Sequence, residues 1–179
     1  MDLNGDGVIN ASDRDWLGTL LPSLEYGLRV DLGYKNFDLS VFGSGVAGKT
    51  GFDPARQFNS FLTVNQNNGP GVLNAWTPQN PNSNTPMLSL VNRNDEFRTS
   101  DFFMVNGSYA KLRNVQLGYT LPKELIARVK MESLRFYLIG QNLFALKSSE
   151  YLSKDPERIG GYGNWPQPTS YTLGVNVAF

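Results

Sequence analysis

The side chains best suited to chemistry lie at the N-terminus, where oxygen-bearing residues recur at the spacing of an EF-hand- or dockerin-like calcium loop. Gly7 stands where such a loop turns sharply, and Asp13 takes the closing position that a Glu usually holds. The spacing predicts a Ca²⁺ site within residues 2–13. Its ligands would be the side chains of Asp2, Asn4, Asp6, Asn10 and Asp13 and the backbone carbonyl of Val8. The alternative is a turn rich in Asp and Asn that binds no metal.

Enzyme chemistry has few candidate residues elsewhere in the chain. The 179 residues contain no His and no Cys, which removes the commonest general base and the thiol nucleophile. Asp155 and Glu157 resemble a glycosidase pair, but a loop turn is the favoured interpretation because no other residue completes a site. We therefore expect a protein that is not an enzyme. The 16 Lys and Arg balance the 16 Asp and Glu, so a nucleic-acid partner is not expected.

The elements that must position these residues are β-strands. Apolar and polar side chains alternate over a hairpin at 25–46 and over three further strands at about 109–120, 133–144 and 171–179. Aromatic residues make up 12% of the chain, which also has 18 Gly and 10 Pro. This composition favours an all-β protein with antiparallel strands and turn-rich loops over a helical bundle.

The connections between these strands alternate in length. Short turns near Lys35 and at 122–130 alternate with long segments at 1–24, 47–107 and 147–168. In outer-membrane barrels, short turns face the periplasm and long loops face the cell exterior. The predicted organisation is therefore an extracellular loop at 1–24, a barrel hairpin at 25–46, a long extracellular loop at 47–107, and the last three barrel strands at 108–179. Aromatic residues scattered through 47–107 indicate that this loop packs.

Two architectures explain strands with one apolar and one polar face. A membrane β-barrel turns its apolar face to lipid, whereas a soluble, calcium-stabilised carbohydrate-binding β-sandwich buries it. The barrel is favoured because the polar face is rich in Gly and Asn and the loops are long. Six side chains distinguish the two, facing lipid in the barrel and forming a dry core in the sandwich: Leu28, Val30, Leu39, Val41, Val175 and Val177.

Five strands are too few to close a barrel, which needs about eight, and open edges are not tolerated in lipid. We therefore expect the chain to form the C-terminal part of a larger barrel. The sequence contains no run of about 18 apolar residues and no signal peptide after Met1. These absences fit either a cytoplasmic protein or a chain whose natural start lies upstream, and the strand pattern favours the second.

Motifs in the first half of the chain are Asp2-x-Asn4-Gly5-Asp6-Gly7-x-Ile9 with Asp13-Arg14, Pro22 with Tyr26-Gly27, and Tyr34-Lys35-Asn36-Phe37-Asp38-Leu39-Ser40. Those in the second half are Ser108-Tyr109-x-Lys111-Leu112-Arg113-Asn114-Val115-x-Leu117-Gly118-Tyr119-x-Leu121-Pro122, Gly140-Gln141-Asn142-Leu143-Phe144, Asp155-Pro156-Glu157, and Tyr171-x-Leu173-Gly174-Val175-x-Val177-x-Phe179. The ordered set resembles the SusC/RagA group of TonB-dependent outer-membrane transporters, and only residues 50–107 match weakly.

The resemblance implies a 22-stranded barrel with an N-terminal plug, of which this chain would supply the final strands. It implies import of oligosaccharides, sometimes peptides, across the bacterial outer membrane. The implied partners are the TonB complex, contacted through a part that lies upstream in such proteins, and a SusD-like surface lipoprotein that lids the barrel. Outer-membrane lipid would surround the wall.

Three aromatic residues are singled out as contact candidates. Sugars stack on aromatic rings, so Trp76 and Trp165 are candidate ligand-binding residues, with loop packing or contact with the lipoprotein as the alternative. By resemblance, the terminal Phe179 belongs to the signal that the barrel-assembly machinery recognises. A plain interfacial aromatic is the alternative for this position.

Overall fold

The computed structural model describes residues 2–8, 10–62, 67–91, 97–127, 131–148, 155–157, 165 and 167–179. Parts of the predicted loops at 47–107 and 147–168, and the end of the predicted turn at 122–130, lie outside these ranges. The main element is an antiparallel sheet in the order β1-β2-β5-β6-β7. Its strands are β1 (Leu24–Tyr34), β2 (Phe37–Ala47), β5 (Tyr109–Thr120), β6 (Ser133–Lys147) and β7 (Ser170–Ala178).

The structure confirms the five predicted strands, with one difference in length. β6 continues to Lys147, beyond the predicted end at residue 144. The register with β5 shifts between Leu112 and Asn114, and beyond this shift β6 continues to pair with β5 from Phe144 to Lys147. β1 and β7 are the edges of the sheet, and each pairs on one side only within the described part of the chain.

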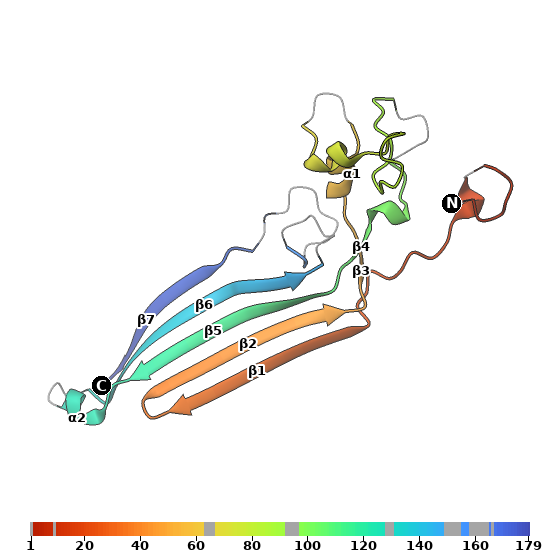
Figure 1. Cartoon of the computed structure of the whole chain (residues 1–179). Helices are drawn as coiled ribbons and strands as arrows, with labels where there is room; N and C mark the ends of the chain where they lie inside the picture. Colours follow the sequence, from red (N-terminus) through yellow and green to blue (C-terminus); the bar gives the residue numbers. More distant parts are fainter. Residues whose placement is uncertain are drawn as a thin grey trace.

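The two ends of the sheet differ in what they carry (Figure 1). One end, here called the short-turn end, holds the β1–β2 turn, α2 (Lys123–Ile126) and the C-terminus. The opposite, long-loop end holds the N-terminal segment with η1 (Ala11–Asp13) and the connection between β2 and β5. This separation is what the alternation of short and long connections predicted. Which end faces the cell exterior stays a prediction.

One face of the curved sheet, called the outward face, is apolar from edge to edge. The pairing register aligns five leucines, one from each strand: Leu32, Leu39, Leu117, Leu138 and Leu173. The adjacent row, nearer the short-turn end, consists of Tyr34, Phe37, Tyr119, Phe136 and Val175. An apolar band bordered by an aromatic row is the pattern of a strand wall that meets lipid.

The opposite, inward face carries polar and charged side chains. Arg135 of β6 reaches across β5 to Asp38 of β2, with Nε 3.0 Å from Oδ1. Gly118 of β5 lies beneath this ion pair, and a Cβ atom there would lie only 2.3 Å from Asp38 Oδ1. A side chain at this position would therefore have to displace the ends of Asp38 and Arg135, so the glycine leaves room for the ion pair that joins β2 to β6 across β5.

The β2–β5 connection has a small core of its own, as the scattered aromatics predicted. It contains β3 (Thr50–Phe52) paired with β4 (Met104–Asn106), together with α1 (Ala55–Ser60), η2 (Pro70–Asn74) and η3 (Asp101–Phe103). The Phe61 ring lies 5.4 Å from that of Phe102 and 5.9 Å from that of Phe103, centroid to centroid. Phe103 is almost fully buried. Among the described residues, no helix has the length and apolar character needed to cross a membrane.

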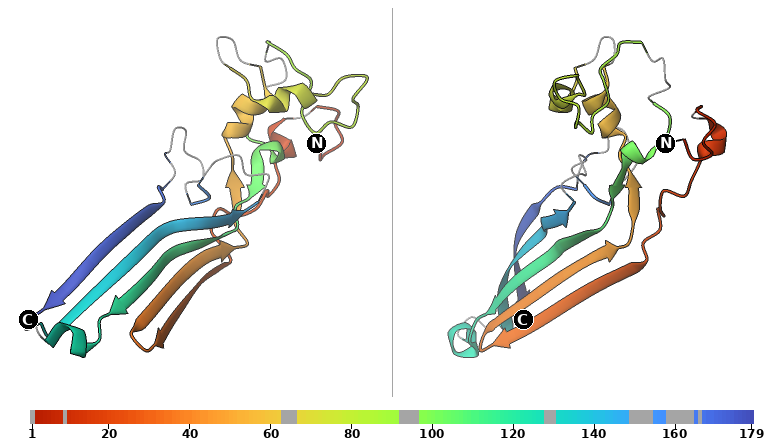
Figure 2. Two further views of the ribbon diagram at one scale, coloured as in Figure 1. Left: turned by 60° about the vertical axis from the view of Figure 1, so that its left-hand side comes forward. Right: turned by 45° about the vertical axis from the view of Figure 1, so that its right-hand side comes forward.

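The outward face does not form the core of a sandwich. Leu28, Val175 and Val177 are 70%, 49% and 44% exposed, whereas a dry core would bury them. Val30 is also exposed, and Leu39 and Val41 are half-buried. The second sheet, β3–β4, lies at the long-loop end and does not cover this face (Figure 2). The sandwich alternative is therefore not favoured.

Lipid contact by the outward face can be tested with neighbouring residues of β7. Leu173→Arg places a charge in the middle of the leucine row and should lower the free energy of unfolding from bilayers by about 2–4 kcal/mol. Thr172→Arg places the same charge on the inward face and should cost less than about 1 kcal/mol. Urea titrations of the membrane protein that carries this chain, refolded in phospholipid vesicles, measure both. Equal losses for the two variants would contradict lipid contact.

Candidate functional site

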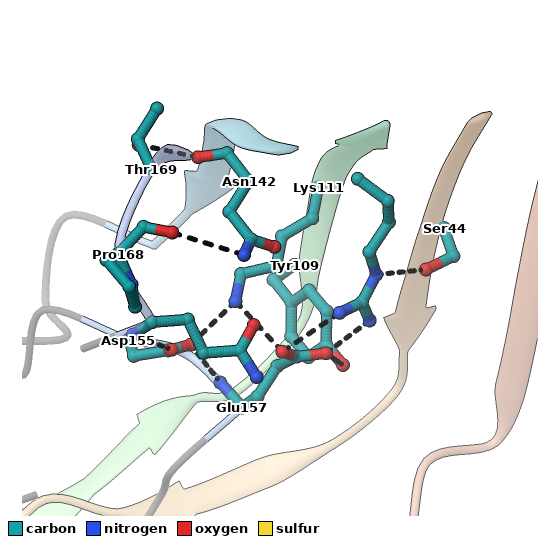
Figure 3. Close-up of polar contacts among 10 residues, drawn as sticks. Ser44, Tyr109, Lys111, Asn142, Asp155, Glu157, Pro168 and Thr169 are labelled. Carbon is teal, nitrogen blue, oxygen red and sulfur yellow. Dashed lines mark hydrogen bonds and ion pairs between the residues drawn. The ribbon is translucent and has the colours of Figure 1, made fainter. Parts of the chain in front are cut away.

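A cluster of charged side chains lies on the inward face near the long-loop end (Figure 3). Two cationic residues, Lys111 and Arg113, come from β5, and two anionic residues, Asp155 and Glu157, come from the connection between β6 and β7. Together with Tyr109 and Ser44, they form what we call the ion-pair cluster.

The contacts within the ion-pair cluster are short and mostly screened from solvent. Lys111 Nζ lies 2.8 Å from Asp155 Oδ1 and 2.9 Å from Glu157 Oε2. The side chains of Lys111 and Asp155 are each 6% exposed. The Arg113 guanidinium contacts both carboxylate oxygens of Glu157, and the distance from Nη1 to Oε2 is 3.1 Å. Such two-point pairing fixes orientation as well as distance.

An irregularity in β5 lets the two cations point the same way. Lys111 pairs with Ser44 of β2 and Ala145 of β6, whereas Arg113 is skipped in the register with both neighbouring strands. Arg113 Nε donates to Ser44 Oγ over 2.8 Å, so its side chain also lies on the inward face. Tyr109, two residues before Lys111, donates its hydroxyl to Glu157 Oε1 over 3.0 Å.

A second set of contacts fixes the start of β7. Asn142 of β6 adopts φ 51°, a left-handed conformation that Asn tolerates better than most residues. Its Nδ2 donates to the carbonyl of Pro168, and Thr169 Oγ1 donates to the carbonyl of Asn142 over 2.8 Å. Figure 3 shows these contacts beside the ion-pair cluster.

Both carboxylates of the cluster are held in the ionised form. Burial raises the pKa of Asp155, but hydrogen bonds from Lys111 and from the backbone N–H groups of Glu157 and Gln167 together bring it below the ordinary value. Burial likewise raises the pKa of Glu157, and hydrogen bonds from Arg113, Lys111 and Tyr109 lower it by more. In both cases the donors outweigh desolvation.

This electrostatic balance decides against glycosidase chemistry at Asp155 and Glu157. A glycosidase needs one carboxyl group whose pKa is raised so that it carries a proton for the leaving group. Here the pKa of each carboxyl is lowered, and both groups are committed to cations of β5. The cluster is arranged to hold a segment of chain in place rather than to transfer protons.

The predicted calcium loop is closed by hydrogen bonds to its own carboxylates. Asp2 accepts the N–H groups of Gly5 and Gly7 at 2.7 and 2.8 Å, and Asp13 accepts those of Leu3 and Asn10 at 2.8 and 2.7 Å. These backbone donors lower the pKa of both Asp2 and Asp13.

The other oxygen atoms that could bind calcium in this loop also accept hydrogen bonds. Asn4 Oδ1 accepts the N–H of Asp6, Asp6 Oδ1 accepts that of Val8, and the carbonyl of Val8 accepts from Asn10 Nδ2. No three Asp, Glu, His or Cys side chains gather as a metal-holding group in the part of the chain that the structure describes. The donor set is nevertheless all oxygen, as calcium prefers. Calcium binding stays a prediction.

The aromatic candidates lie apart in the sequence and in different connections. Trp76 belongs to the β2–β5 connection and is 37% exposed, whereas Trp165 belongs to the β6–β7 connection and is 84% exposed. No interaction between them is recorded among the described residues. Phe179, just beyond β7, is 86% exposed. The roles predicted for all three residues remain predictions.

The sequence-based reasoning missed the ion-pair cluster, although a signal was present. Two cations two residues apart on one strand, Lys111 and Arg113, match two anions two residues apart in a loop, Asp155 and Glu157. Equal spacing and opposite charge indicate a pairing. The sequence separation of 44 residues, from Lys111 to Asp155, concealed it.

Comparison with curated proteins finds relatives along the whole chain, although no family model matches. TonB-dependent receptor P3 of Formosa agariphila is 31% identical over 193 aligned residues, covering 99% of this chain and 18% of the relative. TonB-dependent receptor P26 of the same organism is 32% identical, with 99% and 19% covered. TonB-dependent receptor SusC of Bacteroides thetaiotaomicron is 28% identical, with 100% and 17% covered. The chain thus spans about a fifth of the length of these relatives.

Solved structures give the same result for the fold. The RagAB peptide transporter matches with a TM-score of 0.77 and 25% identity, over 90% of this chain and 18% of the matched chain. The RagAB peptide importer in its open-open state matches with a TM-score of 0.75 and the same identity and coverage. The five-stranded sheet is therefore built like part of an outer-membrane importer barrel.

Calcium binding by residues 2–13 can be measured directly. Isothermal titration of the calcium-free protein with CaCl₂ should show one site, and Asp6→Asn should weaken it by at least about tenfold because a charged ligand is lost. Asp15→Asn, just outside the loop, is the matched control and should leave the affinity unchanged. A titration without saturable heat would favour the metal-free turn.

The ion-pair cluster should weaken in acid. Because the pKa values of Asp155 and Glu157 lie below their ordinary values of 3.8 and 4.5, their stabilising contribution is complete above those values. It is lost as the pH falls through the lowered values. Hydrogen exchange, expressed as protection relative to an unstructured peptide at each pH, should show the Glu157 amide protected at pH 6 and progressively less protected as the pH falls below the ordinary value of 3.8 for Asp155. Protection that stays constant to pH 2 would contradict this assignment.

Proposed function

This chain belongs to the SusC/RagA family of TonB-dependent outer-membrane transporters, and we propose that the protein that carries it imports oligosaccharides or peptides across the bacterial outer membrane. The observation that carries the proposal is the two-faced sheet, apolar outward and polar inward, in the form of an importer barrel wall. The similar proteins are named receptors, importers and transporters, which supports a role that leaves the ligand chemically unchanged.

The partners follow from the same family membership. The outward leucine and aromatic rows suit outer-membrane lipid, and energy would come from the TonB complex. A SusD-like lipoprotein would cover the long-loop end, where the β2–β5 connection with its aromatic core projects beyond the sheet (Figure 1). Phe179 is exposed beside the edge strand β7, so the barrel-assembly machinery can reach it before the edge is paired.

Ligand contact is proposed for Trp165 and Trp76, the tryptophans of the β6–β7 and β2–β5 connections. Trp165 offers most of its surface, and an aromatic ring supplies an apolar platform for a sugar ring or an aromatic peptide side chain. Trp76 is less exposed and makes the weaker candidate of the two.

Uptake in living cells tests the proposal. A strain that lacks the gene for the complete outer-membrane protein should lose uptake of one class of tritiated ligand, oligosaccharides or peptides, and the intact gene should restore it. An uncoupler that collapses the proton gradient should also stop uptake. Uptake that is unchanged for both ligand classes in the deletion strain would refute the proposed function.

The tryptophans can be tested in the same assay. Trp165→Ala should raise the ligand concentration for half-maximal uptake by about 2- to 10-fold, the loss of one aromatic contact. Trp16→Ala removes an equally exposed indole before β1 and should leave that concentration unchanged. Similar shifts in the two variants would indicate a general effect on folding and would contradict a specific role for Trp165.

A further inference from the structure

The connection between β6 and β7 contacts β5, although the two strands that it joins are neighbours in the sheet. β6 and β7 are neighbours in the sheet, so a connection could rise directly from one strand to the other. Instead, Asp155 and Glu157 contact Lys111 and Arg113 of β5, on the far side of β6. Since Lys111 points inward, the Asp155–Glu157 segment lies over the inward face of the wall.

We propose that Lys111 and Arg113 are positioning residues that hold the Asp155–Glu157 segment against the inward wall and so narrow the passage at the long-loop end. The inference rests on the proposed function in one respect, that the inward face lines a passage for ligand. The fixing of the Asp155–Glu157 segment on β5, called the hold below, is inferred from the contacts of the ion-pair cluster alone.

The burial of the segment supports a fixed position. Pro156, between the two anions, is less than 2% exposed, which is rare for a loop proline. Buried ion pairs add little net stability, because desolvation offsets their attraction, but they specify one geometry. Removing a single partner is costly, because the other charge is then left buried and unpaired.

The charge balance indicates a hold rather than a ligand site. Within the cluster two cations face two anions, and Glu157 is engaged by Lys111, Arg113 and Tyr109 together. The charge of Lys147 nearby interacts with both Asp155 and Asp53. No charge is left over within this set to attract an ionic ligand. A charged subsite would instead present an excess of one sign toward the passage.

The carboxylate of Asp155 connects both arms of the connection to β5. Its Oδ1 accepts the backbone N–H of Glu157 over 3.0 Å, and its Oδ2 accepts that of Gln167 over 3.2 Å. Through Lys111, the strand wall therefore holds the chain before and after residues 158–164. Asn142 adds the contact with Pro168 that leads into β7.

Labelling of one engineered cysteine measures the hold. The chain has no native Cys, so in Pro156→Cys the thiol is unique within it. In intact cells that express the complete outer-membrane protein, a membrane-impermeant maleimide should label this thiol slowly. Adding Lys111→Met should speed labelling at least about tenfold. Lys111→Arg keeps the charge and should restore slow labelling, which a change of packing alone would not do.

The control removes an ion pair elsewhere on the same face. Arg29 and Asp31 form an exposed pair on β1, so Asp31→Asn should leave the labelling rate unchanged. Where Pro156→Cys fails to assemble, hydrogen exchange on the protein without the engineered cysteine replaces it. The amides of Glu157 and Gln167 should then lose protection in Lys111→Met and keep it in Asp31→Asn.

The outcomes separate the two proposals. Equal labelling, or equal amide protection, in the wild-type and Lys111→Met backgrounds overturns the hold, whatever the uptake assay gives. Faster labelling in Lys111→Met with rescue by Lys111→Arg supports the hold even where the deletion strain takes up both ligand classes normally. In that case only the proposed function fails.

Discussion

The pairing register of the five strands is the constraint on which the rest of the structure depends. Side chains alternate along a strand, so a slip by one residue would exchange the outward and inward faces. The observed register aligns five leucines in one row and, on the other face, places Asp38 beside Gly118 within reach of Arg135. It also brings Lys111 opposite Ser44, so that the inward face can receive the Asp155–Glu157 segment. The apolar outward face and the polar inward face are thus two results of one hydrogen-bonding pattern.

Departures from regular strand geometry occur where the wall meets its connections. Lys35 and Asn142 are the non-glycine residues with positive φ within the described part of the chain, and both lie where the chain leaves the ideal ladder. Lys35 closes the turn between β1 and β2, as short hairpin turns require. Asn142 lies where the β5–β6 register shifts, and it contacts the segment that begins β7. The shift therefore does more than bend the strand, because it sets the path of the chain that follows.

Much of the fold could be predicted from the sequence because period-two alternation is a local property. The strands, the contrast between their faces and the packing of the β2–β5 connection were all predicted, and only the end of β6 beyond the register shift was missed. The ion-pair cluster could not be predicted in this way. It joins Lys111 to Asp155 across 44 residues and depends on a path around β6 that no local pattern encodes. The calcium loop is the opposite case, since its spacing is evident in the sequence and its predicted ligands lie within 12 consecutive residues, 2–13.

The two edge strands have a consequence for how such a segment behaves in a cell. β1 and β7 each present a row of backbone donors and acceptors without a strand partner in the described part of the chain. The exposed apolar face of the sheet extends from one of these edges to the other. Both edges of such a sheet can pair with another strand, so two copies would readily join edge to edge into an amyloid-like ribbon. Such a sheet avoids aggregation only when both of its edges are paired with further strands. The interval between synthesis and the pairing of these two edges is therefore the stage at which such a sheet is most prone to aggregate.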